Sequence, residues 1–144
     1  MSFYKLWIHL IWSTKNRKKL IDKDLKIKLF NHIRENAKSK DIYIDHINGI
    51  EDHVHLLISL RPDQNISKVV QLIKGESSYW INKNKLIGTK SEWQEEYIAL
   101  SVSESLVPIL REYIRKQENH HNKKSFKEEF DIFIEKYGFD ELTG

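Results

Sequence analysis

The sequence predicts an α+β protein: a ferredoxin-like β-α-β-β-α-β order, with an antiparallel sheet carrying helices on one face, plus a C-terminal tyrosine-bearing helix. Two observations predict this fold. Four stretches alternate apolar and polar residues or are rich in aromatic and β-branched residues, which is typical of strands. The stretches between them repeat apolar residues every three or four positions, which is typical of amphipathic helices. We expect a single domain over residues 1–144.

The elements are expected in a fixed order along the chain. They are a strand at 3–13, a helix at 22–38, strands at 42–48 and 51–60, a helix at 66–81, a strand at 93–102, and helices at about 106–120 and 126–136. Within the first strand, Leu10 and Trp12 share the side expected to face the core with Tyr4, whereas Trp7 and His9 lie on the other side.

Local signals support the first helix and the hairpin that follows it. Leu25, Leu29 and Ile33 recur at four-residue spacing and so form one apolar face. In the second strand, alternation should put Ile44 and His46 on the same face. Asn48-Gly49 is a turn signal, so the second and third strands should form a hairpin around it.

The later elements carry signals of their own. Gly75 lies in the middle of the second helix, weakens it, and could allow a backbone or a base to approach closely. Residues 93–102 are aromatic and β-prone, as expected for a strand. Pro108 is acceptable in the first turn of the 106–120 helix, and Ser125-x-x-Glu128 is a capping box that opens the last helix.

Composition excludes several classes of protein. The chain has no cysteine, which rules out disulfides, zinc ribbons and thiol nucleophiles and favours a cytoplasmic protein. No apolar run approaches about 20 residues, so we expect no membrane-spanning helix. The net charge of +3 is mildly basic, which permits nucleic-acid binding without demanding it.

His53 and His55 are candidate metal ligands. They lie in an alternating strand two residues apart, so both side chains point to the same face. Two imidazoles in that arrangement can hold one divalent ion. A half-buried strand with two hydrogen-bonded histidines would give the same pattern, so the pair by itself leaves both interpretations open.

Tyr113 and Gln117 interrupt the apolar face of the 106–120 helix. They lie one turn apart on the stripe that also carries Leu106 and Leu110. A buried glutamine amide without hydrogen-bond partners would cost about 1–3 kcal/mol, so Gln117 requires partners. A packed tyrosine ring beside a backbone-bonded glutamine explains the pattern as well as a functional pair does.

Several segments resemble the single-tyrosine HUH transposases of small bacterial insertion sequences, the insertion-sequence 200-like transposase family. They are YKLWIHLIWSTKNR, EDHVHLLI, VVQLIKGESSYWIN, WQEEYIALSVSES and YIRKQENHH, and together they cover nearly the whole chain. HUH denotes histidine, a hydrophobic residue and histidine, which here are residues 53–55. The resemblance implies that Tyr113 is the catalytic nucleophile and that Gln117 is the third metal ligand. It also includes the pair His120 and His121, to which it assigns no role.

The resemblance implies a DNA transposase that cleaves and rejoins single-stranded DNA at element ends. In this reaction the Tyr113 oxygen attacks a backbone phosphorus, forms a 5′-phosphotyrosine and releases a 3′-hydroxyl, without a nucleotide cofactor. The family implies Mg²⁺ or Mn²⁺, whereas ligand softness alone would also allow Zn²⁺ or Ni²⁺. The implied partners are a DNA hairpin with a single-stranded flank and a second copy of the chain. The resemblance leaves open whether the tyrosine helix docks on its own histidines or on those of its partner.

Basic and aromatic residues supply candidate DNA contacts. The candidate phosphate contacts are Lys15, Arg17, Lys18, Lys74 and Lys83. Unpaired bases could stack on Trp7, Trp12, Tyr79 or Trp93, although core packing is the commoner role of such residues. Beside the histidines, Glu51 and Asp52 could accept a histidine hydrogen bond or simply be solvated.

Two other functions fit the same resemblance. One is a domesticated relative that processes repeat-associated hairpins by the same chemistry. The other is a catalytically inactive DNA-hairpin-binding protein. The intact set of His53, His55, Tyr113 and Gln117 argues against the inactive protein, because decay would usually strike one of these residues.

Overall fold

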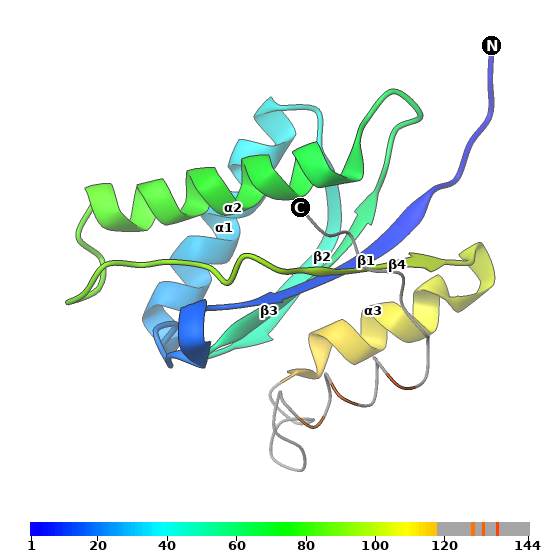
Figure 1. Ribbon diagram of the computed structural model, residues 1–144. Helices are drawn as coiled ribbons and strands as arrows, with labels where there is room; N and C mark the ends of the chain where they lie inside the picture. The colour runs from blue at the N-terminus through cyan, green and yellow to red at the C-terminus, as the bar shows by residue number, and fades with distance from the viewer. Residues whose placement is uncertain (118–127, 129–130, 132–134, 136–144) are drawn as a thin grey trace.

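The computed structural model describes residues 1–117 together with Glu128, Asp131 and Glu135. Four strands form one antiparallel sheet in the order β2-β3-β1-β4 (Figure 1). The strands are β1 (Trp7–Ser13), β2 (Tyr43–Ile50), β3 (His53–Ser59) and β4 (Ile98–Val102). The helices are α1 (Lys23–Ser39), α2 (Ile66–Lys83) and α3 (Val107–Arg115), with short 3-10 turns η1 (Lys15–Arg17) and η2 (Glu104–Leu106). The predicted ferredoxin-like α+β fold is confirmed.

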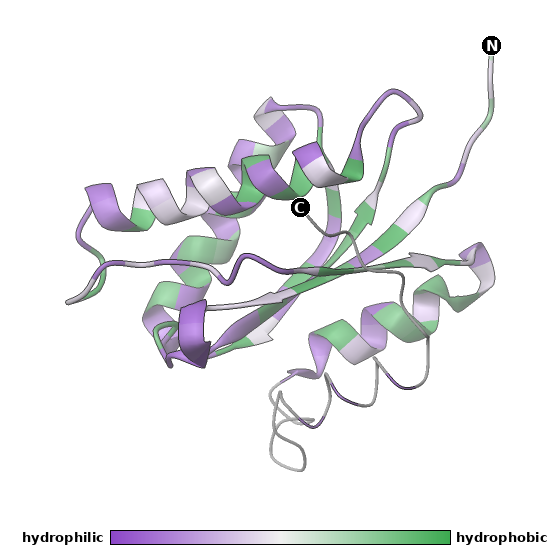
Figure 2. Cartoon of the chain, viewed as in Figure 1, coloured by the Kyte–Doolittle hydropathy of each residue, from purple (hydrophilic) through white to green (hydrophobic). Residues whose placement is uncertain are grey.

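The main core lies between the sheet and the helices α1 and α2. Leu10, Trp12 and Leu56 are almost completely buried in it. Both helices begin at a capping side chain, because Asp22 accepts from Leu25 N and Asn65 accepts from Lys68 N. Figure 2 shows hydrophobic residues along the central strands and alternating with hydrophilic ones along the helices.

The opposite face of the sheet is covered by α3 (Figure 1). Trp7 of β1 and Leu57 of β3 form a smaller apolar cluster with Val107 and Ile114 of α3. The side of β1 that carries Trp7 and His9 is therefore buried as well, which explains why it is unusually aromatic. α3 is the element that turns this second face into an enclosed site.

Three strands are shorter than predicted, and of these β3 spans His53–Ser59 rather than 51–60. β1 begins at Trp7 rather than at residue 3, and Tyr4 and Leu6 are exposed. Trp7 pairs with the last residue of each neighbouring strand, and beyond it the pairing with β3 reduces to a backbone hydrogen bond from Leu60 N to the Leu6 carbonyl oxygen. β4 begins at Ile98 rather than at residue 93, and Trp93 forms only an isolated bridge to Thr14.

The hairpin turn also differs from the prediction. The turn is formed by residues 51–52, while Asn48 and Gly49 belong to β2 and pair with His55 and Val54. A side chain at Gly49 would bring its Cβ to 2.2 Å from the His53 carbonyl oxygen. This glycine is therefore required by the close approach of β3, and not by a turn.

A β-bulge interrupts β2 at Asp45. Ile44 pairs with Ile58 and His46 pairs with Leu57, so one extra residue lies in β2 between these pairs. Because the extra residue reverses the alternation, Ile44 faces the main core whereas His46 is on the α3 side with Leu57. The expected common face for Ile44 and His46 is therefore wrong.

The helix boundaries differ modestly from the predictions. The tyrosine helix α3 spans Val107–Arg115 and begins one residue later than predicted, with Leu106 52% exposed in η2. Residues 118–120 of the predicted 106–120 helix lie outside the described part of the chain. Val107 and Ile114 take the buried positions that the sequence assigned to Leu106. Of the predicted last helix at 126–136, the described residues Glu128, Asp131 and Glu135 are helical. The other residues of that segment, like His120 and His121, lie outside the described part of the chain.

Gly75 lies on an exposed part of α2, where an added Cβ would meet no atom within 4 Å. No protein backbone approaches it, in contrast to Gly49. Within the described residues, none of the helices is both long and apolar enough to cross a membrane.

Candidate active site

The two predicted metal ligands lie together beneath α3. His53 and His55 have no exposed surface, and their ring centroids are 5.1 Å apart. Both belong to β3, a central strand that is hydrogen-bonded to β1 and β2 along its whole length. The sheet therefore holds the backbone of the pair rigidly, and the shared face follows from the alternation that predicted it.

The Nδ1 atom of each histidine contacts a neighbouring side chain. His53 Nδ1 donates to Asp52 Oδ1 at 2.8 Å, and His55 Nδ1 lies 3.0 Å from Nε2 of His9. Glu51 is instead exposed, and its carboxylate lies 3.9 Å from Lys19 Nζ. With Nδ1 engaged in this way, Nε2 is the nitrogen through which each ring would bind a ligand.

His9 belongs to this site, although the sequence analysis assigned it no function. It is 3% exposed, and its ring stacks on His55 with centroids 5.2 Å apart. Burial lowers the pKa of His9 to about 4, so the ring is neutral at neutral pH. Alternation in β1 placed His9 on the correct face, but its contact with His55 depends on the register between β1 and β3.

Tyr113, the predicted nucleophile, lies over the histidines. Its ring centroid is 5.6 Å from that of His55 and 6.3 Å from that of His9, edge-on in both cases. The ring is half-buried against the apolar cluster of Trp7 and Leu57. In this chain the tyrosine helix is thus docked on the histidines of the same molecule.

Gln117, the predicted third ligand, has no exposed surface and follows the last turn of α3. Its Nε2 donates to the Tyr113 carbonyl oxygen at 3.3 Å. That bond turns the amide nitrogen toward the helix, so Oε1 is the atom suited to binding a cation. The amide that the sequence required to find partners is therefore bonded to backbone, one turn from the tyrosine.

The donor set of His53, His55 and Gln117 offers two imidazole nitrogens and one amide oxygen. Such donors suit a divalent ion of intermediate hardness, and three protein ligands leave positions for phosphate oxygens. Among the described residues, no three His, Cys, Asp or Glu side chains are grouped to hold a metal. The candidate set differs from such a group because its third donor is a glutamine.

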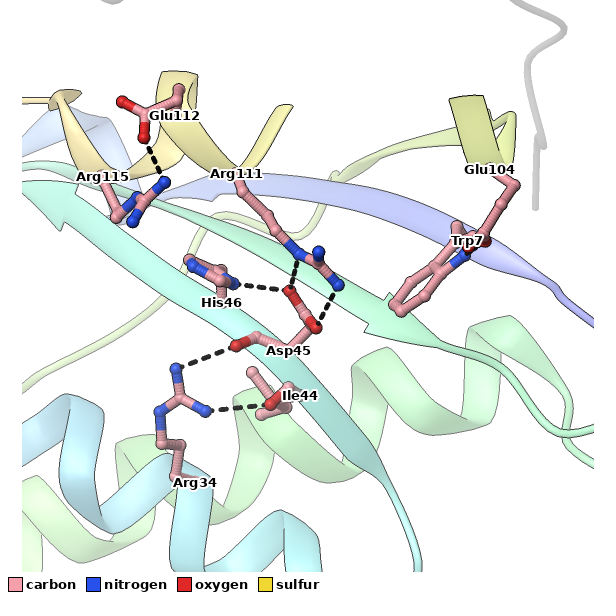
Figure 3. A network of polar contacts seen from close by, with 9 residues as sticks. All are labelled: Trp7, Arg34, Ile44, Asp45, His46, Glu104, Arg111, Glu112 and Arg115. Atoms are coloured by element: carbon pink, nitrogen blue, oxygen red, sulfur yellow. Dashed lines mark hydrogen bonds and ion pairs between the residues drawn. The ribbon is translucent and has the colours of Figure 1, made fainter. Parts of the chain in front are cut away.

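A half-buried ion pair links α3 to the sheet (Figure 3). Arg111 donates to both carboxylate oxygens of Asp45, from Nε at 2.8 Å and from a terminal nitrogen at 3.0 Å. Asp45 projects from the β-bulge and also accepts from His46. Arg34 of α1 donates to the carbonyl oxygens of Ile44 and Asp45, so the bulge is anchored from both layers.

The two ends of α3 are also held by side chains from the sheet. Near its C-terminus, Asn48 of β2 donates from Nδ2 to the carbonyl oxygens of Ile114 (2.9 Å) and Arg115 (3.1 Å). On the N-terminal side of α3, the Trp7 indole donates to Glu104 of the preceding turn η2. Because the carbonyl oxygens at the C-terminus of α3 lack intrahelical donors, Asn48 acts as a C-terminal cap supplied by another element. By holding α3 against the sheet, these contacts fix the position of Tyr113 relative to His55.

We expect Asp45→Asn to loosen α3 at neutral pH. Burial opposes ionisation of Asp45, but hydrogen bonds from Arg111 and His46 outweigh it and hold its pKa below the ordinary value. A carboxyl with a lowered folded-state pKa contributes stability above about pH 4, which is lost as the pH falls through the folded-state pKa. The substitution should lower the free energy of unfolding by about 1–3 kcal/mol at pH 7, and by less toward pH 3.

Chemical denaturation across this pH range measures the effect. Glu112→Gln on the same helix is the matched control, because Glu112 pairs with Arg115 and Lys116 at the surface and should change stability by less than about 0.5 kcal/mol. An equal loss in both variants, or a loss at Asp45 that does not vary with pH, would contradict this role for the carboxylate.

The predicted basic residues fall into two groups. Lys15, Arg17 and Lys18 lie in or beside η1 and are exposed. Thr14 N donates to the carbonyl of Asp52 at 2.8 Å, and Leu20 N donates to that of Glu51. The basic turn is therefore bound to the turn that precedes His53, at one edge of the histidine site.

Lys74 and Lys83 lie on α2, across the sheet from α3. The Lys74 ammonium donates to the carbonyl oxygens of Gln94 and Glu95, and burial lowers its pKa. Lys83 lies 5.8 Å above the ring of Tyr79. Of the candidate stacking residues, Tyr79 is 62% exposed, whereas Trp7 and Trp12 are buried and Trp93 donates to Ser77.

Comparisons with known proteins identify a family. Residues 2–117 match the family model described as "Transposase IS200 like". The chain belongs to the IS200-like transposase family. It is 32% identical over 120 residues to the ISDra2 transposase TnpA of Deinococcus radiodurans, a match that covers 79% of this chain and 85% of that protein.

Two solved structures share the fold of this IS200-like chain. A protein of Deinococcus radiodurans described as a transposase superposes with a TM-score of 0.66 at 27% identity, covering 81% of this chain and 93% of that one. A REP-associated tyrosine transposase bound to a REP hairpin superposes with a TM-score of 0.59 at 16% identity, covering 85% and 74%. The predicted family is confirmed.

Proposed function

We propose that this IS200-like transposase cleaves and rejoins single-stranded DNA through a covalent bond to Tyr113. The observation that carries the proposal is the position of the Tyr113 ring, 5.6 Å from His55 and on the same face as His53. A phenol beside a pair of candidate metal ligands is suited to nucleophilic attack on a phosphodiester. Membership of the family supports a DNA-processing enzyme.

The proposed reaction exchanges one phosphodiester for another. The Tyr113 oxygen attacks the phosphorus, forming a tyrosine–phosphate bond as the bond to the 3′-oxygen breaks. The phenolic proton is released, and the departing 3′-oxygen leaves as a hydroxyl. In the second step a 3′-hydroxyl attacks the same phosphorus and displaces the tyrosine, so bond energy is conserved without a nucleotide cofactor.

His53, His55 and Gln117 would hold Mg²⁺ or Mn²⁺ in this proposal. A divalent ion there supplies polarisation of the scissile phosphate and neutralises charge that develops in the transition state. The chain's own contribution is orientation. Asp52 and the strand backbone orient His53, while the contacts of α3 to β2 hold Tyr113 in a fixed position relative to the histidines.

The exposed residues Lys15, Arg17 and Lys18 are the proposed phosphate contacts nearest the site. They are carried by a turn bonded to the carbonyls of Glu51 and Asp52, beside His53. A DNA hairpin bound by this turn would present its single-stranded flank to Tyr113. One structural neighbour is described as bound to a REP hairpin, and a hairpin partner forms part of the present proposal. The proposal also includes a homodimer, which the family resemblance implies.

We expect the protein to cut a single-stranded flank and not the same sequence in duplex form. The site is enclosed between a sheet and α3, so an extended flexible strand enters it more easily than a stiff duplex. The net charge of +3 is too small to melt a duplex by counterion release alone.

The test compares two end-labelled oligonucleotides with the same hairpin and cleavage sequence, taken from the DNA that flanks the gene. One carries a single-stranded flank, and the other has that flank annealed to its complement. With Mg²⁺ present, only the first should give a covalent protein–DNA adduct. Comparable cutting of both would favour a duplex nuclease instead.

A further inference from the structure

We infer that His9 is a positioning residue that sets the tautomer and orientation of His55, an inference that rests on the proposed metal-binding role of His55. The two rings face each other between β1 and β3, with His9 Nε2 3.0 Å from His55 Nδ1. Their centroids are 5.2 Å apart at an interplanar angle of 26°. Both side chains are buried, at 3% and 0% exposure, so bulk water does not compete for this contact.

The contact joins two nitrogens and therefore holds one proton. If His55 donates from Nδ1, its Nε2 keeps the lone pair that a metal requires, and His9 carries its own proton on Nδ1. If His9 donates instead, His55 carries its proton on Nε2 and cannot bind a metal there. A ligand role for His55 through Nε2 therefore requires His9 to be the acceptor.

His53 is oriented in the same way, through a hydrogen bond from Nδ1, but to a different acceptor. Its Nδ1 donates to the Asp52 carboxylate at 2.8 Å, which fixes Nε2 as the ligating atom. Carboxylates and neutral acceptors both orient metal-bound histidines in this way. His9 thus takes, for His55, the place that Asp52 takes for His53.

The position of His9 is itself fixed by the sheet. Its backbone pairs with Leu57 on one side and Leu100 on the other, in the central strand β1. The Tyr113 ring, with its centroid 6.3 Å away and nearly perpendicular to it, covers it from the α3 side. A ring held by two strands and a helix provides the stable acceptor that an orienting role needs.

Two substitutions separate orientation from core packing. His9→Leu keeps a buried apolar side chain of similar volume but removes the acceptor. His9→Gln places an amide oxygen near the position of Nε2 and restores an acceptor. A histidine that only filled space would tolerate leucine at least as well as glutamine.

The first readout is the tautomer of His55 in the metal-free protein, measured by long-range ¹H–¹⁵N correlation NMR on histidine-labelled samples. We expect His55 to carry its proton on Nδ1 in the wild type and in His9→Gln, and to populate the Nε2–H form in His9→Leu. His53 should remain an Nδ1–H donor in all three proteins, which provides an internal control for folding. A wild-type His55 protonated on Nε2 would overturn the inference, even if His9→Leu fails to fold.

The second readout is the affinity for Mn²⁺ measured by calorimetry. His9→Leu should bind about 10- to 100-fold more weakly than the wild type, while His9→Gln should stay within a few-fold of it. If His9→Leu binds Mn²⁺ as tightly as the wild type while His55→Ala does not bind it, the role of His9 is overturned and the metal site stands. No Mn²⁺ binding by the wild type would instead refute the proposed metal site, and the NMR measurement would still decide which nitrogen of His55 is protonated.

Discussion

Replacing Tyr113 by phenylalanine is expected to abolish the covalent protein–DNA adduct while leaving hairpin binding nearly unchanged. The aromatic ring packs against the cluster of Trp7 and Leu57 and edge-on to His55, and phenylalanine preserves all of these contacts. Only the oxygen that would attack the phosphorus is lost. Because the reaction would then have no nucleophile, the rate of adduct formation should fall by about 10⁴-fold or more.

Denaturing gel electrophoresis of the protein with an end-labelled single strand detects the adduct, and a gel-shift titration measures hairpin binding. Tyr43→Phe is the matched control, because Tyr43 is 58% exposed at the start of β2 and should not affect the adduct. The free energy of unfolding of Tyr113→Phe should lie within about 1 kcal/mol of the wild-type value. An adduct that persists in Tyr113→Phe would identify another residue as the nucleophile.

The element order was predictable because each element carries a local signal. Alternation placed His53 and His55 on one face without any knowledge of the sheet, since a strand has a period of two. The helical stripe likewise placed Tyr113 and Gln117 one turn apart. Those two periodicities therefore predicted which side chains share a face, whereas their contact across elements depended on how α3 docks.

The features that sequence analysis missed depend on partners distant in the chain. The contact between Asp45 and Arg111 joins residues 66 positions apart, and it exists because a bulge turns Asp45 toward α3. The contact of His9 with His55 requires the register of β1 on β3. No local pattern contains that information, and the bulge even reverses the alternation from which the face of His46 was predicted.

Gly49 shows how a valid local signal can have another cause. Asn-Gly commonly forms a hairpin turn, but here the ladder continues through both residues and the turn lies at 51–52. The glycine is needed because the His53 carbonyl oxygen lies where a Cβ would be. The requirement for glycine was therefore real, although its reason became visible only in the paired strands.

We expect His53→Ala and His55→Ala each to lower Mn²⁺ affinity by more than about 100-fold and to abolish metal-dependent cleavage. Loss of a direct ligand should cost more than loss of an orienting partner, which by itself costs about 10- to 100-fold. Both side chains are fully buried and bonded to Asp52 or His9, so each truncation should also destabilise the metal-free protein by about 1–3 kcal/mol.

Calorimetric titration with Mn²⁺ measures the affinity, and the thermal shift on adding Mn²⁺ supplies an independent readout, because a ligand that binds only the folded state raises its stability. His32→Ala is the matched control. His32 is a half-buried histidine that bonds Glu76 and stacks on Trp80 between α1 and α2, on the other side of the sheet. Its removal should cost stability without changing the Mn²⁺-induced shift. Equal Mn²⁺ affinity of the wild type, His53→Ala and His55→Ala would rule out the two-histidine site, whereas loss of the shift only in the β3 variants would assign the metal to the face beneath Tyr113.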